Sequence, residues 1–517
     1  MIYIFNYTNN LIIEKLIKNS LFNTYGEISI KVIKGNLKPS DFDLLHLVVM
    51  IGTFKKRSRE ILEQLKNRNI KIIILGNICD DLKKILNIDD YNFGDLGYET
   101  IKYIKKNNTT QSYYAIISKK NQLYKSNYKR SFEYYSYEKE WNNFGYGKID
   151  NSSPLFKISS QVKLNIINEL SFIQNEKKNF CGSYSGLWKD DNCVLWFNRL
   201  VGPFDSFEWR VLENFVSNFK YKDFKCIPLV LEIPYKDMGV ATVRLDCDED
   251  VASSEKLVSF YEKKRIPVSL AVVTDLLKIK KNVTFLKKVT KSNVDILSHS
   301  KTHRPHWGGD FETALWEGQE SRNDIYRTLK LVSSIAVSPF HQSPGYAVKA
   351  LEKAGYELLV SGIIKNDPFM LISRAGRSIH ADKIISLTQQ CMLHGDIAES
   401  KNSLKDYYKI IKLFKHSKMI FGYLDHPFSK RYKYGWGNEK KRINYHRKIV
   451  EYLKQKRFTF YNISKISEFI QNKHKIILKK DNNKFFLRND FYKNKMDYGV
   501  EYKGKKFKLS YELIINE

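Results

Sequence analysis

The sequence is poor in cysteine and contains no motif that would pair its cysteines. There are six in 517 residues, and none forms a CxxC motif. This scatter argues against a disulfide framework and fits a reducing compartment. The opening residues, MIYIFNYTNN, also lack the basic region and the long apolar region of a signal peptide. We therefore expect a cytoplasmic protein.

Long apolar runs are missing as well. The longest, near Leu44 to Gly52, is too short to span a bilayer and is typical of a buried strand. The chain is nevertheless 43% hydrophobic and 14% aromatic, which is enough for a sizeable core. We expect a folded, soluble protein that at most touches the inner face of a membrane.

Acidic residues are too few to balance the basic ones. The chain has 87 Lys and Arg against 56 Asp and Glu, a formal charge of +31. Such an excess suits an anionic partner, but lysines spread from end to end are more typical of a solvated surface. No nucleic-acid motif stands out, so we do not expect a nucleic-acid partner. Residues 1–105 contain no G-x-G-x-x-G and no P-loop, so nothing there predicts a nucleotide site.

The order of strand-like and helix-like segments predicts an α/β protein in four parts. Residues 1–105 alternate as in a small parallel βαβ domain. Residues 106–235 indicate an α+β domain of unknown role. Residues 236–475 alternate often enough to favour a distorted (β/α) barrel, and residues 476–517 form a short β-rich tail.

Three predicted strand ends carry residues suited to metal binding or acid–base chemistry. Asp246 and Asp248 in RLDCDED share one face of a strand, and two close carboxylates need a cation or proton between them. His299 and His303 in HSKTH could meet one metal if the loop turned helical, and His426 ends a later strand in YLDHPF. One carboxylate and two imidazoles form a common zinc ligand set. Taken singly, each segment fits a solvated acidic turn, a polar loop or a structural histidine equally well.

The order of these segments resembles the NodB-type polysaccharide deacetylase domain, carbohydrate esterase family four. ATVRLDCDED is similar to its first motif, VDILSHSKTH to its second and GYLDHPF to its last. SPFHQSPGYAVKALEKAGYELLVSG resembles the third-motif loop and the helix that follows it. The resemblance covers residues 236–475, about half of the chain.

This resemblance implies a role for each matching residue. Asp246 takes the position of the catalytic base. Asp248, His299 and His303 take the positions of ligands to a divalent metal, for which we expect zinc. His426 takes the position of the acid that protonates the leaving amine.

The third motif departs from the family pattern. The family carries an arginine two residues before the proline, where it helps to hold the catalytic Asp, and this chain has Gln342 there. Arg244 or Arg374 could replace that arginine. The fourth motif is unclear, with Asp396 as a candidate and His394 beside it. The predicted substrate-binding or supporting residues are Gln342, Pro344, Tyr346, Arg374, His394 and Asp396.

The resemblance implies a metal-dependent hydrolase that removes an N-acyl group, expected to be acetyl, from an amino sugar. The expected substrate is a lipid-linked or nucleotide-linked precursor of a surface glycan, whose phosphates would suit a basic protein. The alternative is a catalytically inactive carbohydrate-binding or scaffolding protein that keeps the fold. A nucleic-acid binder would rest on charge alone.

Overall fold

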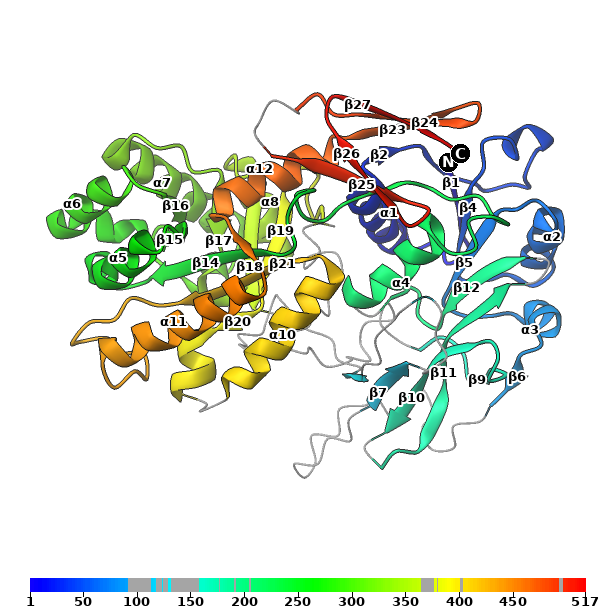
Figure 1. Cartoon of the computed structure of the whole chain (residues 1–517), viewed down its shortest axis with the longest axis horizontal. Coiled ribbons are helices and arrows are strands. Elements are labelled where there is room, and N and C mark those ends of the chain that lie inside the picture. The colour runs from blue at the N-terminus through cyan, green and yellow to red at the C-terminus, as the bar shows by residue number, and fades with distance from the viewer. Residues whose placement is uncertain are drawn as a thin grey trace.

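The structure is a computed structural model of the full chain (Figure 1). It describes residues 1–91, 113–117, 123, 129–131, 158–175, 177–189, 192–203, 206–363, 376–378, 380–399, 403–491 and 496–517. Within these ranges, no helix is both long and apolar enough to cross a bilayer.

The second half of the chain is built around a ring of parallel strands. β14 (Val240–Cys247) pairs on one side with β15 (Val268–Val272), and on the other side with β21 (Ile420–Asp425). The first side continues through β16 (Val294–Ser298), β17 (Ile335–Val337), β18 (Leu358–Ile363) and β19 (Ile385–Gln389). The second side ends in β20 (Cys391–Met392), which only Gln390 separates from β19. The strand path therefore closes on itself, which confirms the predicted distorted (β/α) barrel.

Helices cover the outside of this ring because each has one apolar face. In α10 (Leu404–Ser417), for example, Tyr407, Ile410, Ile411 and Phe414 are buried at helical spacing. The other helices around the barrel are α5 (Glu255–Lys263), α6 (Lys280–Val289), α7 (Phe311–Leu329), α8 (Gly345–Lys353) and α11 (Glu439–Gln455).

A second large sheet holds the first half of the chain. Its parallel part runs in the order β3 (Ile30–Val32), β1 (Ile2–Asn6), β4 (Leu47–Ile51), β5 (Lys71–Leu75) and β12 (Cys193–Phe197). Its antiparallel part continues through β11 (Phe180–Lys189), β10 (Glu169–Asn175), β7 (Tyr113–Ile117) and β8 (Lys129–Ser131). The sheet thus combines a parallel part with an antiparallel part, and the division of residues 1–235 into two domains stays a prediction. The boundary at residue 105 stays a prediction, and strands from both sides of it share this sheet.

In the part of the chain that the structure describes, four α-helices belong to this half. They are α1 (Leu11–Tyr25), α2 (Lys55–Leu65), α3 (Asp80–Leu86) and α4 (Ser206–Ser217). The aromatic side chains of this half serve its core: Trp196 and Trp209 are fully buried, and their ring nitrogens donate to Gly76 O and Thr24 Oγ1.

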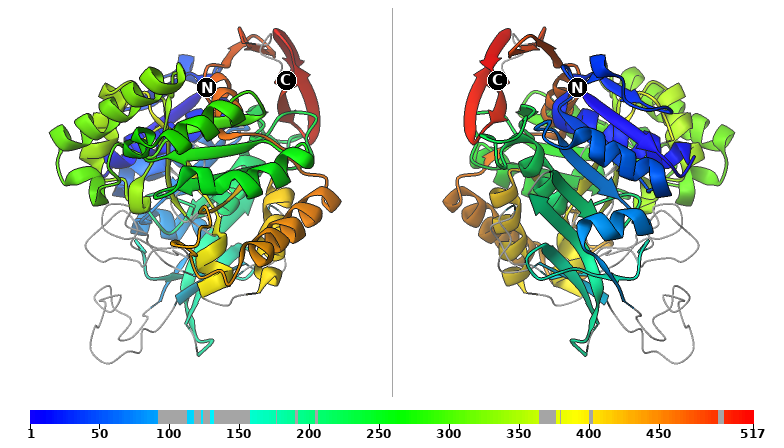
Figure 2. Two further views of the ribbon diagram at one scale, coloured as in Figure 1. Left: turned by 90° about the vertical axis from the view of Figure 1, so that its left-hand side faces the viewer. Right: turned by 90° about the vertical axis from the view of Figure 1, so that its right-hand side faces the viewer.

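The tail joins the two halves. Its strands β23 (Ile477–Asp481), β24 (Lys484–Arg488) and β27 (Glu512–Asn516) form a sheet with β2 (Glu27–Ile28). β25 (Tyr498–Tyr502) pairs on one side with β13 (Leu229–Val230) and on the other side with β26 (Lys505–Leu509). Figure 2 shows the red tail strands at the same end of the molecule as the blue N-terminal segment.

Helix α12 (Ile463–His474) lies at the amino end of the barrel. The backbone N–H of Ile463 donates to Ser269 Oγ at 2.9 Å, and that of Ser464 to Asp295 Oδ2 at 2.8 Å. Both acceptors lie on the second residue of a barrel strand. Helix α12 therefore covers the amino end of the barrel, opposite the carboxyl ends of the strands.

Candidate active site

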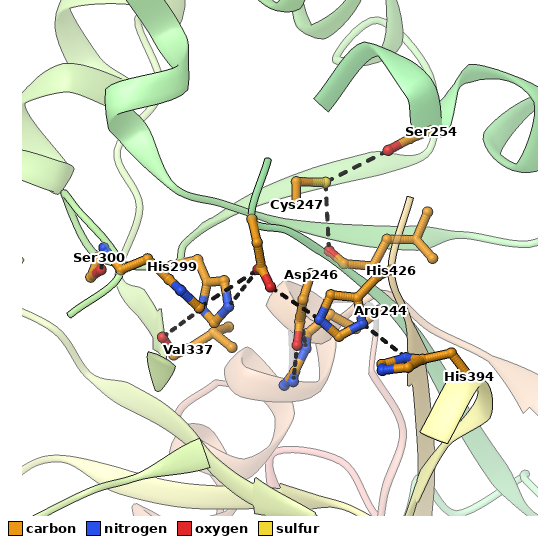
Figure 3. A network of polar contacts seen from close by, with 12 residues as sticks. Arg244, Asp246, Cys247, Ser254, His299, Ser300, Val337, His394 and His426 are labelled. Carbon is orange, nitrogen blue, oxygen red and sulfur yellow. Dashed lines mark hydrogen bonds and ion pairs between the residues drawn. The ribbon is translucent and has the colours of Figure 1, made fainter. Parts of the chain in front are cut away.

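The three predicted strand-end motifs meet at the carboxyl end of the barrel. Asp246 lies at the end of β14 with Asp248 just beyond it, His299 directly follows β16, and His426 directly follows β21. Because the strands are parallel, these ends share one rim. Figure 3 shows Asp246, His299 and His426 converging there.

Asp248, His299 and His303 form a cluster suited to one cation. Their nearest ligand atoms all lie within 4.8 Å of one another. Asp248 Oδ1 is 3.2 Å from His299 Nε2 and 3.7 Å from His303 Nε2, and it is buried with no hydrogen-bond donor in the described chain. The carbonyl of Val337 accepts from His299 Nδ1 at 3.0 Å, so Nε2 keeps its lone pair for a ligand. These residues fit a divalent metal.

The turn between the two histidines differs from the expected helical loop. Ser300 and His303 both have left-handed backbones, with φ of 67° and 58°. Ser300 Oγ accepts from the N–H of His303 at 2.9 Å, and the two imidazole centroids lie 4.7 Å apart. The helical loop considered from the sequence is not needed, because this tight turn brings the rings together without a helix.

Glu317 on α7 holds this turn in place. Its side chain is fully buried and accepts from the N–H groups of Lys301 and Thr302, both at 2.8 Å, and from the Thr302 hydroxyl. Sequence reasoning did not identify Glu317. The available signal was an acid placed between Ala314 and Ser321 on the buried face of an otherwise amphipathic helix.

Arg244 holds the predicted base. Its Nε and Nη2 donate to the two oxygens of Asp246 at 2.6 and 2.8 Å, and both side chains are buried. Burial acts to raise the pKa of Asp246, but the adjacent guanidinium outweighs it and lowers the pKa to about 2. Of the two replacements considered for the missing arginine, Arg244 makes this contact, whereas Arg374 lies outside the described residues.

Gln342 and Tyr346 contact the loop that follows His303. Gln342 Oε1 accepts from the N–H of His306 at 2.9 Å, and the Tyr346 hydroxyl donates to the carbonyl of His306 at 2.6 Å. Pro344 is the N-cap residue of α8. In this structure Gln342 contacts a turn, and it is Arg244 that pairs with Asp246.

His426 lies across the site from His299. Its Nε2 is 3.2 Å from Asp248 Oδ2, and the ring of Tyr434 stacks on it with centroids 4.6 Å apart. Burial acts to lower the pKa of His426, but the charge of Asp248 leads the opposing effects and the pKa is raised overall.

The two residues considered for the fourth motif have different surroundings. His394 Nδ1 lies 3.1 Å from His426 Nδ1 (Figure 3). Asp396 is fully buried and accepts from the N–H of Met392 at 3.2 Å and from the Tyr407 hydroxyl at 2.7 Å. It is thus His394 that contacts His426, while Asp396 secures the chain next to β20.

The fold and site together define a class: a closed parallel barrel whose carboxyl end joins an arginine-held aspartate, a cation-binding cluster and a buried histidine. The sequence matches no protein-family model and no curated protein.

Solved structures do show a likeness. One is the carbohydrate esterase family-four domain of a multidomain xylanase from the hindgut metagenome of Trinervitermes trinervoides, at 11% identity over 45% of this chain and 90% of that chain, TM-score 0.31. A family-four acetyl xylan esterase from Clostridium thermocellum, solved with cobalt, has 11% identity over 44% and 91%, TM-score 0.30. A family-four pseudoenzyme from Bacillus anthracis has 10% identity over 45% and 66%, TM-score 0.31.

These structures carry the name of the family that the sequence motifs resemble. At such identities and TM-scores the likeness carries no argument about activity.

Proposed function

We propose that this chain is a metal-dependent amide hydrolase that removes an N-acyl group, in the first instance acetyl, from an amino sugar. One observation carries the proposal. Three strand ends, far apart in sequence, bring an ionised and firmly held Asp246, the Asp248 cation cluster and the buried His426 to one place.

Each group has a task in hydrolysis of an amide. A divalent cation held by Asp248, His299 and His303 would polarise the amide carbonyl and lower the pKa of water to roughly 7. Asp246, kept ionised by Arg244, would accept the proton of the attacking water. His426 would donate a proton to the departing nitrogen, which is a very poor leaving group as an amide anion.

The substrate and surroundings follow from the same proposal. The two-imidazole, one-carboxylate set favours zinc. With a net charge of +31, the chain would suit the phosphates of a lipid-linked or nucleotide-linked glycan precursor, in the cytoplasm or against an anionic membrane face. The alternative of an inactive scaffold rested on Gln342, and Arg244 removes much of that support because Asp246 is held without the family arginine.

The test is acetate release from N-acetylglucosamine oligosaccharides and from a nucleotide-linked N-acetyl sugar, each with the zinc-loaded protein. We expect His299→Ala and His303→Ala to lose the ion of the Asp248 cluster and turnover together. Asp246→Asn should keep the metal and lose turnover by about 10²–10⁴-fold, the usual contribution of a general base.

Three results would count against this function. They are an inactive wild-type protein on every amide tested, full metal content in both histidine variants, or wild-type turnover in Asp246→Asn. The surface variant His416→Ala is the matched control and should change neither readout.

A further inference from the structure

A second group of potential metal ligands lies behind His426. The nearest ligand atoms of His394, Asp425 and His426 all fall within 4.8 Å of one another, and all three side chains are buried. We propose that this group is a second divalent-cation site, distinct from the Asp248 cluster, with His426 placed between the two.

Two of the three ligand-to-ligand separations are close to those of a tetrahedral zinc site. His426 Nδ1 and His394 Nδ1 are 3.1 Å apart, and His394 Nδ1 is 3.5 Å from Asp425 Oδ1. Ligands bound to zinc at about 2.0–2.1 Å in a tetrahedron lie about 3.3 Å from one another. Both measured separations fall close to this value.

One oxygen of Asp425 points to the same conclusion. Asp425 is fully buried, and its Oδ2 accepts from His446 Nε2 at 2.9 Å. Its Oδ1 has no hydrogen-bond donor in the described chain and faces His394 at a distance too long for a good hydrogen bond. A buried carboxylate oxygen without a donor is costly, and a bound cation would remove that cost.

The hydrogens on the two neutral imidazole rings also cannot satisfy all three facing atoms. Because His426 Nε2 faces the carboxylate of Asp248 at 3.2 Å, the neutral ring carries its hydrogen there and presents a lone pair at Nδ1. A single hydrogen on His394 Nδ1 can point at His426 Nδ1 or at Asp425 Oδ1, but it serves only one of them well. One cation among the three atoms satisfies all of them.

The neighbouring charged side chains do not fully neutralise the carboxylate of Asp425. Arg442 Nε lies 3.9 Å from Asp425 Oδ2, and its Nη2 lies 3.5 Å from Glu439 Oε1. One guanidinium is thus shared between two carboxylates, so a negative charge remains near Asp425. Buried charge of this kind is normally compensated by a partner or a metal.

Occupancy would also fix the orientation of His426. A cation on Nδ1 leaves Nε2 as the nitrogen that carries a proton, turned toward Asp248. This consequence for catalysis rests on the proposed function, whereas the cation site itself does not.

The experiment counts cobalt ions per chain. Metal-free full-length protein is titrated with Co²⁺, passed through a desalting column, and assayed by mass spectrometry of the metal and by visible absorption, which reports tetrahedral Co²⁺. We expect two ions in the wild type, one in His394→Ala and one in the double variant His299→Ala/His303→Ala. The control His416→Ala should keep two.

One ion in the wild type would overturn the second site and leave a proton shared by His394 and His426 in its place. Two ions in His394→Ala would also overturn it. His394→Gln, with circular dichroism to confirm folding, gives a second variant in case alanine disturbs the core. If the wild-type protein binds one ion and still releases acetate, the second cation site is disproved and the proposed function is not. If it binds two ions and releases no acetate, the proposed function is disproved and the second cation site is not.

Discussion

At the scale of single residues, the pairing of Arg244 with Asp246 sets the charge of the proposed base. Removing one partner of a buried ion pair leaves the other charge uncompensated, which typically costs about 3–5 kcal/mol. We therefore expect Arg244→Gln to lower the free energy of unfolding by about that amount, measured by urea denaturation. The double variant Arg244→Gln/Asp246→Asn should recover much of the loss, because it leaves no buried charge unpaired. An Arg244→Gln protein as stable as the wild type would show that the pair is not a buried ion pair in solution.

The same pair sets the response of the site to acid. The pKa of Asp246 is lowered to about 2, against an ordinary value of about 3.9. A lowered carboxyl pKa stabilises the fold fully above the ordinary value, and this stabilisation disappears as the pH falls from about 4 through about 2. Without Arg244, burial would instead raise the pKa of Asp246. In Arg244→Gln we expect the acidic limb of the turnover-against-pH curve to move to higher pH. An unmoved limb would mean that another group controls it, and Asp246→Asn provides the comparison for stability.

At the scale of elements, α7 prepares the cation cluster through one side chain. Glu317 accepts from two successive N–H groups of the turn between His299 and His303. Residues that orient metal ligands typically contribute about 10–100-fold to metal affinity. We expect Glu317→Gln to weaken zinc binding within this range, measured by competition with a chromophoric chelator. Glu320→Gln on the same helix is the control and should bind zinc like the wild type. Equal zinc affinities in the two variants would show that the turn keeps its conformation without Glu317.

Some elements of the fold and of the site could be predicted from the sequence, and others could not. The strand-end motifs were predictable because a strand, its terminal carboxylates and the next turn are local in sequence. The barrel was predictable from the repeated alternation of strands and helices. Glu317 and His446 were missed because they act on residues that other elements supply. The His299–His303 spacing suggested a helical loop, but left-handed residues at Ser300 and His303 give the same proximity with a turn.

At the scale of the whole molecule, the tail helps to hold the N-terminal half together. Leu478, Phe485, Leu487 and Val500 of the tail are buried in the same hydrophobic core as Ile13, Leu16 and Ile17 of α1. Phe469 of α12 stacks on Tyr498 of the tail with ring centroids 5.1 Å apart. The tail therefore joins the N-terminal sheet to the helix that closes the amino end of the barrel.

Deleting residues 476–517 tests this arrangement. Each large apolar side chain that loses its burial costs about 1.5–3 kcal/mol, and a typical domain has about 5–15 kcal/mol of stability in total. Four such side chains already approach that total, so we expect the truncated chain to be largely insoluble or to unfold far below the wild type in a thermal scan. The control Lys505→Ala/Lys506→Ala changes two exposed positions of the same tail and should keep the wild-type transition. A soluble truncated chain with an unchanged thermal transition would show that the tail packs on the N-terminal half without stabilising it. The barrel alone would then have to hold α12 and the site in place.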